Sequence, residues 1–142
     1  MVYKNRKSSP AEEKAKKTAG RVFEPEEIDT TILKIIPYEY PESRITSELT
    51  TDEFTCLCPF SGLPDFARIT IRYIPAKKLI ELKSLKYYLY AFRNVRIYNE
   101  HAVNKILKDL VEVLDPREME ITGEFTSRGG ITNKVSKKYL KA

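Results

Sequence analysis

The chain has 142 residues, 42% of them hydrophobic, which suffices for the core of one domain, and no apolar run approaches the ~18 residues of a membrane span. Its net charge of +5 lies in the two ends, since residues 1–20 carry +4 and residues 128–142 carry +5, which leaves −4 on residues 21–127. A nucleic-acid-binding domain would carry a basic stripe on its folded surface, so this distribution argues against a stable nucleic-acid complex.

The N-terminal residues 1–20 are rich in Lys, Glu, Ala and Ser, and we expect a flexible basic tail there without the apolar segment of a secretory signal. One domain is expected at 21–133, followed by a second basic tail at 134–142. The two cysteines are one residue apart, which is a poor disulfide framework. A reducing, cytoplasmic compartment and no membrane association are therefore the simplest setting.

The first half of the domain is expected to be mainly extended. A short apolar segment at 32–36 stops at Pro37, and residues 44–53 have the composition of a polar strand. Apolar and polar residues alternate at 66–74, which is typical of a half-buried strand. Residues 79–82 form a further short extended piece.

The second half contains two helices and two strands. Apolar residues at helical spacing predict one helix over 84–93, capped by the serine at its start, and another over 99–114, stopped by an Asp-Pro pair. Alternation from Met119 predicts a strand, and a last strand begins at Ile131 after a glycine pair. This order predicts an α+β domain, with an antiparallel four-stranded sheet and two helices on one face.

The strongest candidates for catalytic residues lie in the segment 54–65, which holds both cysteines. Cys58 and Asp65 lie seven residues apart, and two prolines and a glycine restrict the loop between them. A thiol beside a proton donor is the minimum requirement for covalent catalysis on an electrophilic carbon. The residues alone also allow one cysteine to pack as a small hydrophobe and the other to be incidental.

Several motifs follow this loop at set distances. They are Glu-Leu-Lys-Ser-Leu-Lys-Tyr-Tyr at 81–88, Phe-Arg-Asn at 92–94, Asn-Glu-His at 99–101 and Phe-Thr-Ser-Arg-Gly-Gly at 125–130. With the Cys-Pro loop, they make residues 32 to 131 similar to the NADPH-dependent 7-cyano-7-deazaguanine reductases of queuosine biosynthesis, in their short, single-module form.

The resemblance implies a tunnelling fold (T-fold), in which subunits join sheet to sheet into an oligomeric barrel with active sites between subunits. Pentameric rings paired as a decamer are expected for the short form. The implied reaction reduces the nitrile of 7-cyano-7-deazaguanine to a primary amine and consumes two NADPH. The sequence contains no G-x-G-x-x-G motif, so NADPH binding rests on the resemblance alone.

The resemblance also assigns roles to individual residues. Cys58 would be the nucleophile that forms a thioimide, and Asp65 would be the proton donor. No metal is implied. The substrate-binding residues would be Ile80, Glu81, Leu82, Asn99 and Glu100, and the cofactor-binding residues Lys83, Ser84, Lys86, Arg128 and Gly129.

Two of these assignments have a simpler structural alternative. Glu100 could accept two neighbouring N–H groups of the base in a bidentate contact, but an acid in the first turn of a helix also stabilises the helix dipole. Lys83 and Lys86 could meet the cofactor phosphates or lie on a solvated helix face. In the family a histidine usually precedes the glutamate, whereas here Asn99 precedes it and His101 follows.

Three other functions remain open from the sequence. Cys56, Cys58 and His101 could bind zinc, as in tunnelling-fold cyclohydrolases. Relatives of the reductases act instead on the cyano-base in tRNA and form an amidine, although the lysine-bearing motif favours a reductase. An RNA-binding protein would use the basic ends only, and its binding would be steeply salt-dependent.

Overall fold

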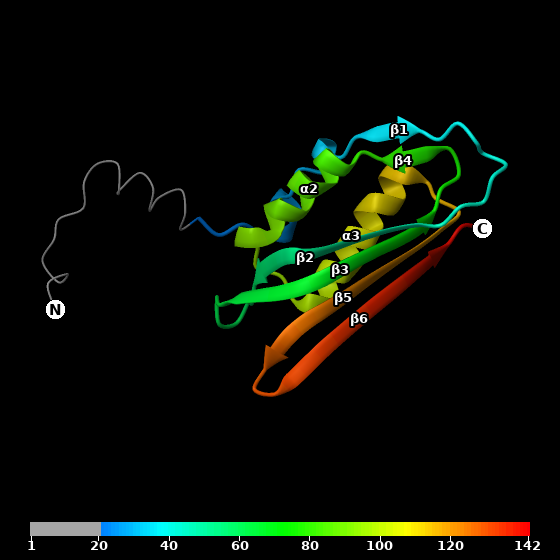
Figure 1. Cartoon of the computed structure of the whole chain (residues 1–142). Helices are drawn as coiled ribbons and strands as arrows, with labels where there is room; N and C mark the ends of the chain where they lie inside the picture. The colour runs from blue at the N-terminus through cyan, green and yellow to red at the C-terminus, as the bar shows by residue number, and fades with distance from the viewer. Residues whose placement is uncertain (1–20) are drawn as a thin grey trace, which may run out of the picture.

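The structure is a computed structural model that describes residues 21–142, and its centre is a four-stranded antiparallel sheet in the order β2-β3-β5-β6 (Figure 1). The bounds are Ser47–Leu57 for β2, Pro64–Ile74 for β3, Glu118–Arg128 for β5 and Ile131–Leu140 for β6. The predicted α+β class with an antiparallel sheet is confirmed. β2 is longer than expected and contains Cys56.

Two helices lie on one face of this sheet (Figure 1). α2 spans Leu82–Tyr90 and continues as a 3-10 turn at Ala91–Asn94, and α3 spans the predicted Asn99–Leu114. A buried Tyr88 hydroxyl of α2 donates to Asp109 Oδ2 of α3 over 2.6 Å, and Lys105 Nζ lies 3.0 Å from the same oxygen. This buried polar contact fixes α2 against α3.

The start of α2 differs from the prediction. The helix begins two residues before Ser84, and its N-cap is Glu81, whose side chain accepts hydrogen bonds from the backbone N–H groups of Lys83 and Ser84. A glutamate is an uncommon cap, so the sequence pattern pointed to the nearby serine instead. Ser84 is buried, and its hydroxyl donates to the Glu81 carbonyl over 2.7 Å.

The two short extended segments form a second sheet. β1, Ile35–Pro37, pairs antiparallel with β4, Lys78–Ile80, with Ile36 opposite Leu79. Short 3-10 turns at Pro25–Glu27 and Thr30–Ile32 precede them. This sheet places the start of α2 beside the far end of β3, where Ile80 N–H donates to the Tyr73 hydroxyl over 3.2 Å.

The C-terminal residues belong to the domain. β6 pairs with β5 as far as Leu140, and its half-buried Val135 and Tyr139 pack against the core. The prediction of a tail from residue 134 is therefore corrected: lysines alternate with these apolar residues, and their charge masked a strand pattern. The tail predicted at 1–20 lies outside the described residues. Over 21–142, no helix is long and apolar enough to cross a membrane.

Candidate active site

The loop that holds Cys58 is closed by two backbone hydrogen bonds. Cys58 N–H donates to the Leu63 carbonyl over 2.9 Å, and Gly62 N–H donates to the Cys58 carbonyl over 2.9 Å. Gly62 has a φ of +71°, in the left-handed region that favours glycine. The loop joins β2 to β3 where Leu57 pairs with Pro64, so the thiol is held at one end of the sheet.

The two cysteines have opposite environments. Cys56 is fully buried in β2, and burial raises the pKa of its thiol to about 12. Cys58 is half-exposed, and hydrogen bonds from the Ser61 hydroxyl and then from the backbone N–H groups of Ser61 and Phe60 lower the pKa of its thiol. A lowered pKa favours the nucleophilic thiolate, so Cys58 has the environment of a reactive thiol, whereas Cys56 is a core residue.

Asp65 lies at the start of β3, directly opposite Cys56, and is almost fully buried. Arg128, at the end of β5, places its Nε 3.0 Å from Asp65 Oδ1 and donates from Nη2 to the Pro64 carbonyl over 2.8 Å. A buried carboxylate requires such a partner. The guanidinium of Arg128, a predicted cofactor-binding residue, thus orients the Asp65 carboxylate, and its cofactor role stays a prediction. Gly129 follows it in the β5–β6 turn with open space where a side chain would be.

Glu100 lies in the first turn of α3. Its Oε1 accepts a hydrogen bond from Asn133 Nδ2 of β6 over 3.0 Å. Hydrogen bonds from its own backbone N–H and then from Asn133 lower the pKa of the carboxyl. The Oδ1 atom of the neighbouring Asn99 is buried and has no hydrogen-bond partner among the described residues. No local sequence signal predicts this role of Asn133, because it lies 33 residues from Glu100.

The start of α3 is brought to the thiol loop by the backbone of the segment before it. Leu57 N–H donates to the Val95 carbonyl over 2.9 Å, and Ile97 N–H donates to the Leu57 carbonyl over 3.0 Å. Cys58, the residue after Leu57, is therefore on the same end of the sheet as α3's first turn and the β5–β6 turn. We call this group the thiol end; it consists of Cys58, Asp65, Asn99, Glu100, Arg128 and Gly129.

The other predicted site residues lie at the opposite end. Ile80 is buried beside Tyr73, eight residues along β3 from Asp65, which corresponds to roughly 27 Å at about 3.4 Å per residue. A hydrogen bond from the backbone N–H of Ser84 lowers the pKa of the Glu81 carboxyl. We call this group the α2 start; it consists of Ile80, Glu81, Leu82, Lys83 and Ser84. One chain therefore does not bring the two groups together.

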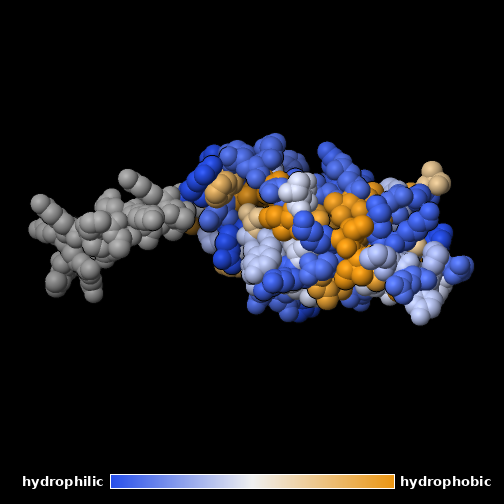
Figure 2. Space-filling view, turned by 90° about the horizontal axis from the view of Figure 1, so that it is seen from above, coloured by the Kyte–Doolittle hydropathy of each residue, from blue (hydrophilic) through white to orange (hydrophobic). Residues whose placement is uncertain are grey.

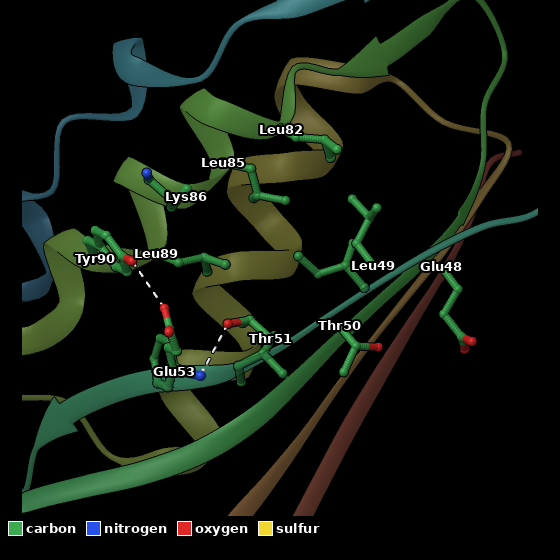
Figure 3. Close-up of a pocket in the computed structure, with 13 residues that line it drawn as sticks. Glu48, Leu49, Thr50, Thr51, Glu53, Leu82, Leu85, Lys86, Leu89 and Tyr90 are labelled. Carbon is green, nitrogen blue, oxygen red and sulfur yellow. Dashed lines mark hydrogen bonds between the residues drawn. The ribbon is translucent and has the colours of Figure 1, made fainter.

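A groove of about 420 Å³ lies between α2 and β2, and Figure 3 shows its labelled lining. Leu82, Leu85 and Leu89 of α2 face Leu49 of β2 across it, and the Tyr90 hydroxyl donates to Glu53 Oε2 over 3.1 Å at its end. Figure 2, viewed from above, shows a band of apolar surface across the molecule. The groove opens along β2, an edge strand of the sheet.

A zinc site is not evident in the part of the chain that the structure describes. No three His, Cys, Asp or Glu side chains there lie close enough together to hold a metal ion. Cys56 is buried with its Sγ 3.9 Å from the Ile97 carbonyl, and the ring of His101 packs edge-on against Tyr98. Two of the three residues considered for zinc, Cys56 and His101, thus have other contacts.

The fold and the thiol end define an α+β protein with an activated cysteine next to a buried carboxylate. Residues 64–142 match the family described as QueF-like protein. Proteins named NADPH-dependent 7-cyano-7-deazaguanine reductase from Caldicellulosiruptor bescii and Caldanaerobacter subterraneus are 60% and 54% identical over 82% and 91% of this chain, and 88% and 96% of their own lengths. The chain belongs to the family of NADPH-dependent 7-cyano-7-deazaguanine reductases.

A solved structure supports the fold alone. The apo form of the archaeosine synthase QueF-Like aligns with a TM-score of 0.65 and 19% identity, over 70% of this chain and 98% of that one. The names of the curated relatives favour the reductase over the zinc-dependent and amidine-forming alternatives.

Proposed function

We propose that this protein reduces 7-cyano-7-deazaguanine to 7-aminomethyl-7-deazaguanine with two NADPH, in queuosine biosynthesis, through a thioimide on Cys58. The observation that carries the proposal is the contrast between the two thiols in a chain of this family. Cys58 is accessible and has a lowered pKa, whereas Cys56 is buried and its pKa is about 12. An accessible thiolate is the nucleophile that a weakly electrophilic nitrile carbon requires.

The proposed reaction has the following steps. The Cys58 thiolate adds to the nitrile carbon while the nitrile nitrogen takes a proton, which leaves a covalent thioimide. NADPH, when bound, supplies the hydride for each of the two reductions. After the first reduction the C–S bond breaks, which releases the thiolate and an imine, and the imine carbon is then reduced to the amine. Asp65, whose carboxyl contacts Arg128, would deliver protons to the nitrogen.

The base would be held at the thiol end. Glu100 is exposed, its pKa is lowered, and a carboxylate can accept two adjacent N–H groups of a deazaguanine. Asn99 brings a buried oxygen that lacks a partner among the described residues, so it can accept a further hydrogen bond. Both features are those of a polar recognition site.

The exposed lysines of α2 fit an anionic cofactor. Lys83 and Lys86 make no ion pair with the described residues, and Lys86 Nζ lies 5.1 Å from the Tyr87 ring centroid. They would hold the phosphates of NADPH. Ser84 fits less well, because its hydroxyl donates to Glu81 and accepts from Lys34 N–H over 2.9 Å.

The separation of the site residues supports a tunnelling-fold barrel. The thiol end and the α2 start are roughly 27 Å apart along β3 in one chain, and the sheet ends in two unpaired strands, β2 and β6. Assembly into pentameric rings and a decamer would supply the α2 start from a second subunit. The accessible thiol also suits the reducing cytoplasm.

The direct test is to mix the protein with the cyano-deazaguanine and NADPH, follow the nicotinamide absorbance and identify the product by mass. We expect the absorbance to fall by two NADPH for each aminomethyl product. An amidine product, or no consumption of NADPH with an intact, folded protein, would contradict the proposed reaction.

A further inference from the structure

The loop between β2 and β3, residues 58–63, carries the most exposed of the large apolar side chains in the described part of the chain. Phe60 is 93% exposed. A single exposed apolar residue is ordinary on a protein surface. Phe60 differs in its position, because it lies two residues from the Cys58 thiol and its ring has almost no packing role in the fold. A ring in this position is available to a ligand at the thiol.

The backbone that carries Phe60 is fixed, although the ring is not. The Cys58–Leu63 and Gly62–Cys58 backbone hydrogen bonds close the loop, and Leu63 N–H also donates to Ser61 Oγ over 3.2 Å. The Phe60 N–H is itself one of the groups that donate to the Cys58 thiol. An exposed side chain changes rotamer within picoseconds to nanoseconds. The ring can therefore turn toward a molecule at the thiol without any change in the backbone.

The thioimide of the proposed function brings the base within reach of this ring. One carbon atom, the former nitrile carbon, would join Cys58 Sγ to the ring system of the base. The Cα atoms of Cys58 and Phe60 are at most about 7 Å apart, since two residues span no more than that. A base attached through one carbon therefore lies within the reach of the Phe60 side chain.

A flat base needs different contacts at its edge and on its faces. Glu100 and Asn99 offer oxygen atoms, which suit the N–H groups along the edge. The two faces of a heteroaromatic ring favour aromatic or aliphatic cover. Phe60 and Leu63, the latter 57% exposed, are the large apolar side chains of the loop. Of these two, only Phe60 has a ring that can stack on a base.

We propose that the Phe60 ring stacks on one face of the deazaguanine base and thereby helps to hold the nitrile carbon at Cys58. Phe60 is then a substrate-binding residue, and it favours nitriles carried by a flat ring system over small aliphatic nitriles. The inference rests on the proposed function, because the base reaches this loop only if its nitrile reacts with Cys58.

Alanine and tryptophan substitutions test the stack. In a Cys58→Ala background, where no covalent adduct forms, calorimetric titration measures the non-covalent affinity for the nitrile. Adding Phe60→Ala should weaken this affinity about tenfold, whereas Phe60→Trp should keep it close to that of the background. The affinity for NADP⁺ should stay the same in both variants. Tyr40→Ala is the matched control and should change neither affinity, because Tyr40 is a 68% exposed aromatic residue in the segment before β2.

Phe60→Trp also gives a direct optical signal, because the chain contains no tryptophan. Indole emission is quenched when another aromatic ring system stacks on it. The emission of Cys58→Ala/Phe60→Trp should therefore fall as the cyano-deazaguanine is added and should not respond to acetonitrile, which has a nitrile but no ring.

Unchanged nitrile affinity in Phe60→Ala, or indole emission that does not respond to saturating cyano-deazaguanine, would overturn the stack. Weaker NADP⁺ binding with normal nitrile binding would also overturn it, because the ring would then serve the cofactor. The reaction can fail separately. A protein that consumes no NADPH but loses nitrile affinity with Phe60→Ala would refute the reaction and keep the stack, whereas turnover by the wild type with unchanged affinity in Phe60→Ala would refute only the stack.

Discussion

The predicted site residues at the two ends of the sheet differ in their structural roles. At the thiol end, contacts between distant segments orient two carboxylates: Arg128 holds Asp65, and Asn133 holds Glu100. At the α2 start, Ile80 is buried in the core, while Glu81 and Ser84 hold the helix start together. We therefore propose that the thiol end carries the chemistry, while the α2 start offers the exposed Lys83.

The largest effect after loss of the nucleophile is expected from Asp65. Asp65→Asn keeps a polar side chain beside Arg128 but removes the transferable proton. We expect nitrile binding to persist and kcat to fall by roughly 10²–10⁴. Single-turnover kinetics with measured nitrile affinity would check this. An unchanged kcat would remove Asp65 from the mechanism and weaken the distinction between the two ends.

Glu100→Ala at the thiol end and Lys83→Ala at the α2 start should each weaken the binding of a different ligand. Each hydrogen bond from the base to the Glu100 carboxylate is worth about 1.5–3 kcal/mol, so Glu100→Ala should weaken nitrile binding at least roughly tenfold and leave NADPH binding near normal. Lys83→Ala should weaken NADPH binding and leave nitrile binding near normal. The nitrile affinity of Glu100→Gln should lie between those of wild type and Glu100→Ala. Calorimetric titration of each variant with each ligand measures the nitrile and NADPH affinities. Normal nitrile affinity in Glu100→Ala would leave Glu100 only a helix-dipole role.

A smaller effect is expected from Asn133, whose amide orients the Glu100 carboxylate. Asn133→Ala should weaken nitrile binding several-fold, because the carboxylate loses its fixed orientation. Asn104→Ala is the matched control, since Asn104 Nδ2 donates over 2.9 Å to the backbone carbonyl of Glu100 and not to its carboxylate. Equal losses in both variants, measured by the same titration, would indicate a general effect on α3.

The smallest effect concerns the reactivity of the thiol. Because the Ser61 hydroxyl is the largest cause of the lowered pKa of Cys58, Ser61→Ala should raise that pKa. The pH dependence of iodoacetamide alkylation should shift to higher pH, and the rate at neutral pH should fall, since less thiolate is present. Ser47→Ala, at the far end of β2, is the control. Identical profiles for wild type and Ser61→Ala would refute this cause.

Local patterns in the sequence predicted much of the fold. The apolar stripe of 99–114 gave α3 with its observed bounds, and the alternation at 66–74 gave most of β3. Pairings between distant segments could not be predicted, such as β1 with β4, or Asn133 with Glu100, because no local signal encodes them. The sequence predicted a tail beyond residue 133, where β6 continues, because alternating lysines obscure the apolar pattern of Val135 and Tyr139.

The most direct test of the central claim compares the two cysteines by intact-mass analysis after incubation with the nitrile. The wild-type protein and Cys56→Ala should both gain the mass of the nitrile as a covalent adduct, because the buried Cys56 takes no part in the chemistry. Cys58→Ala should gain no mass and should not turn over. An adduct retained in Cys58→Ala, or lost in Cys56→Ala while the fold is intact, would contradict the assignment of Cys58 as the nucleophile.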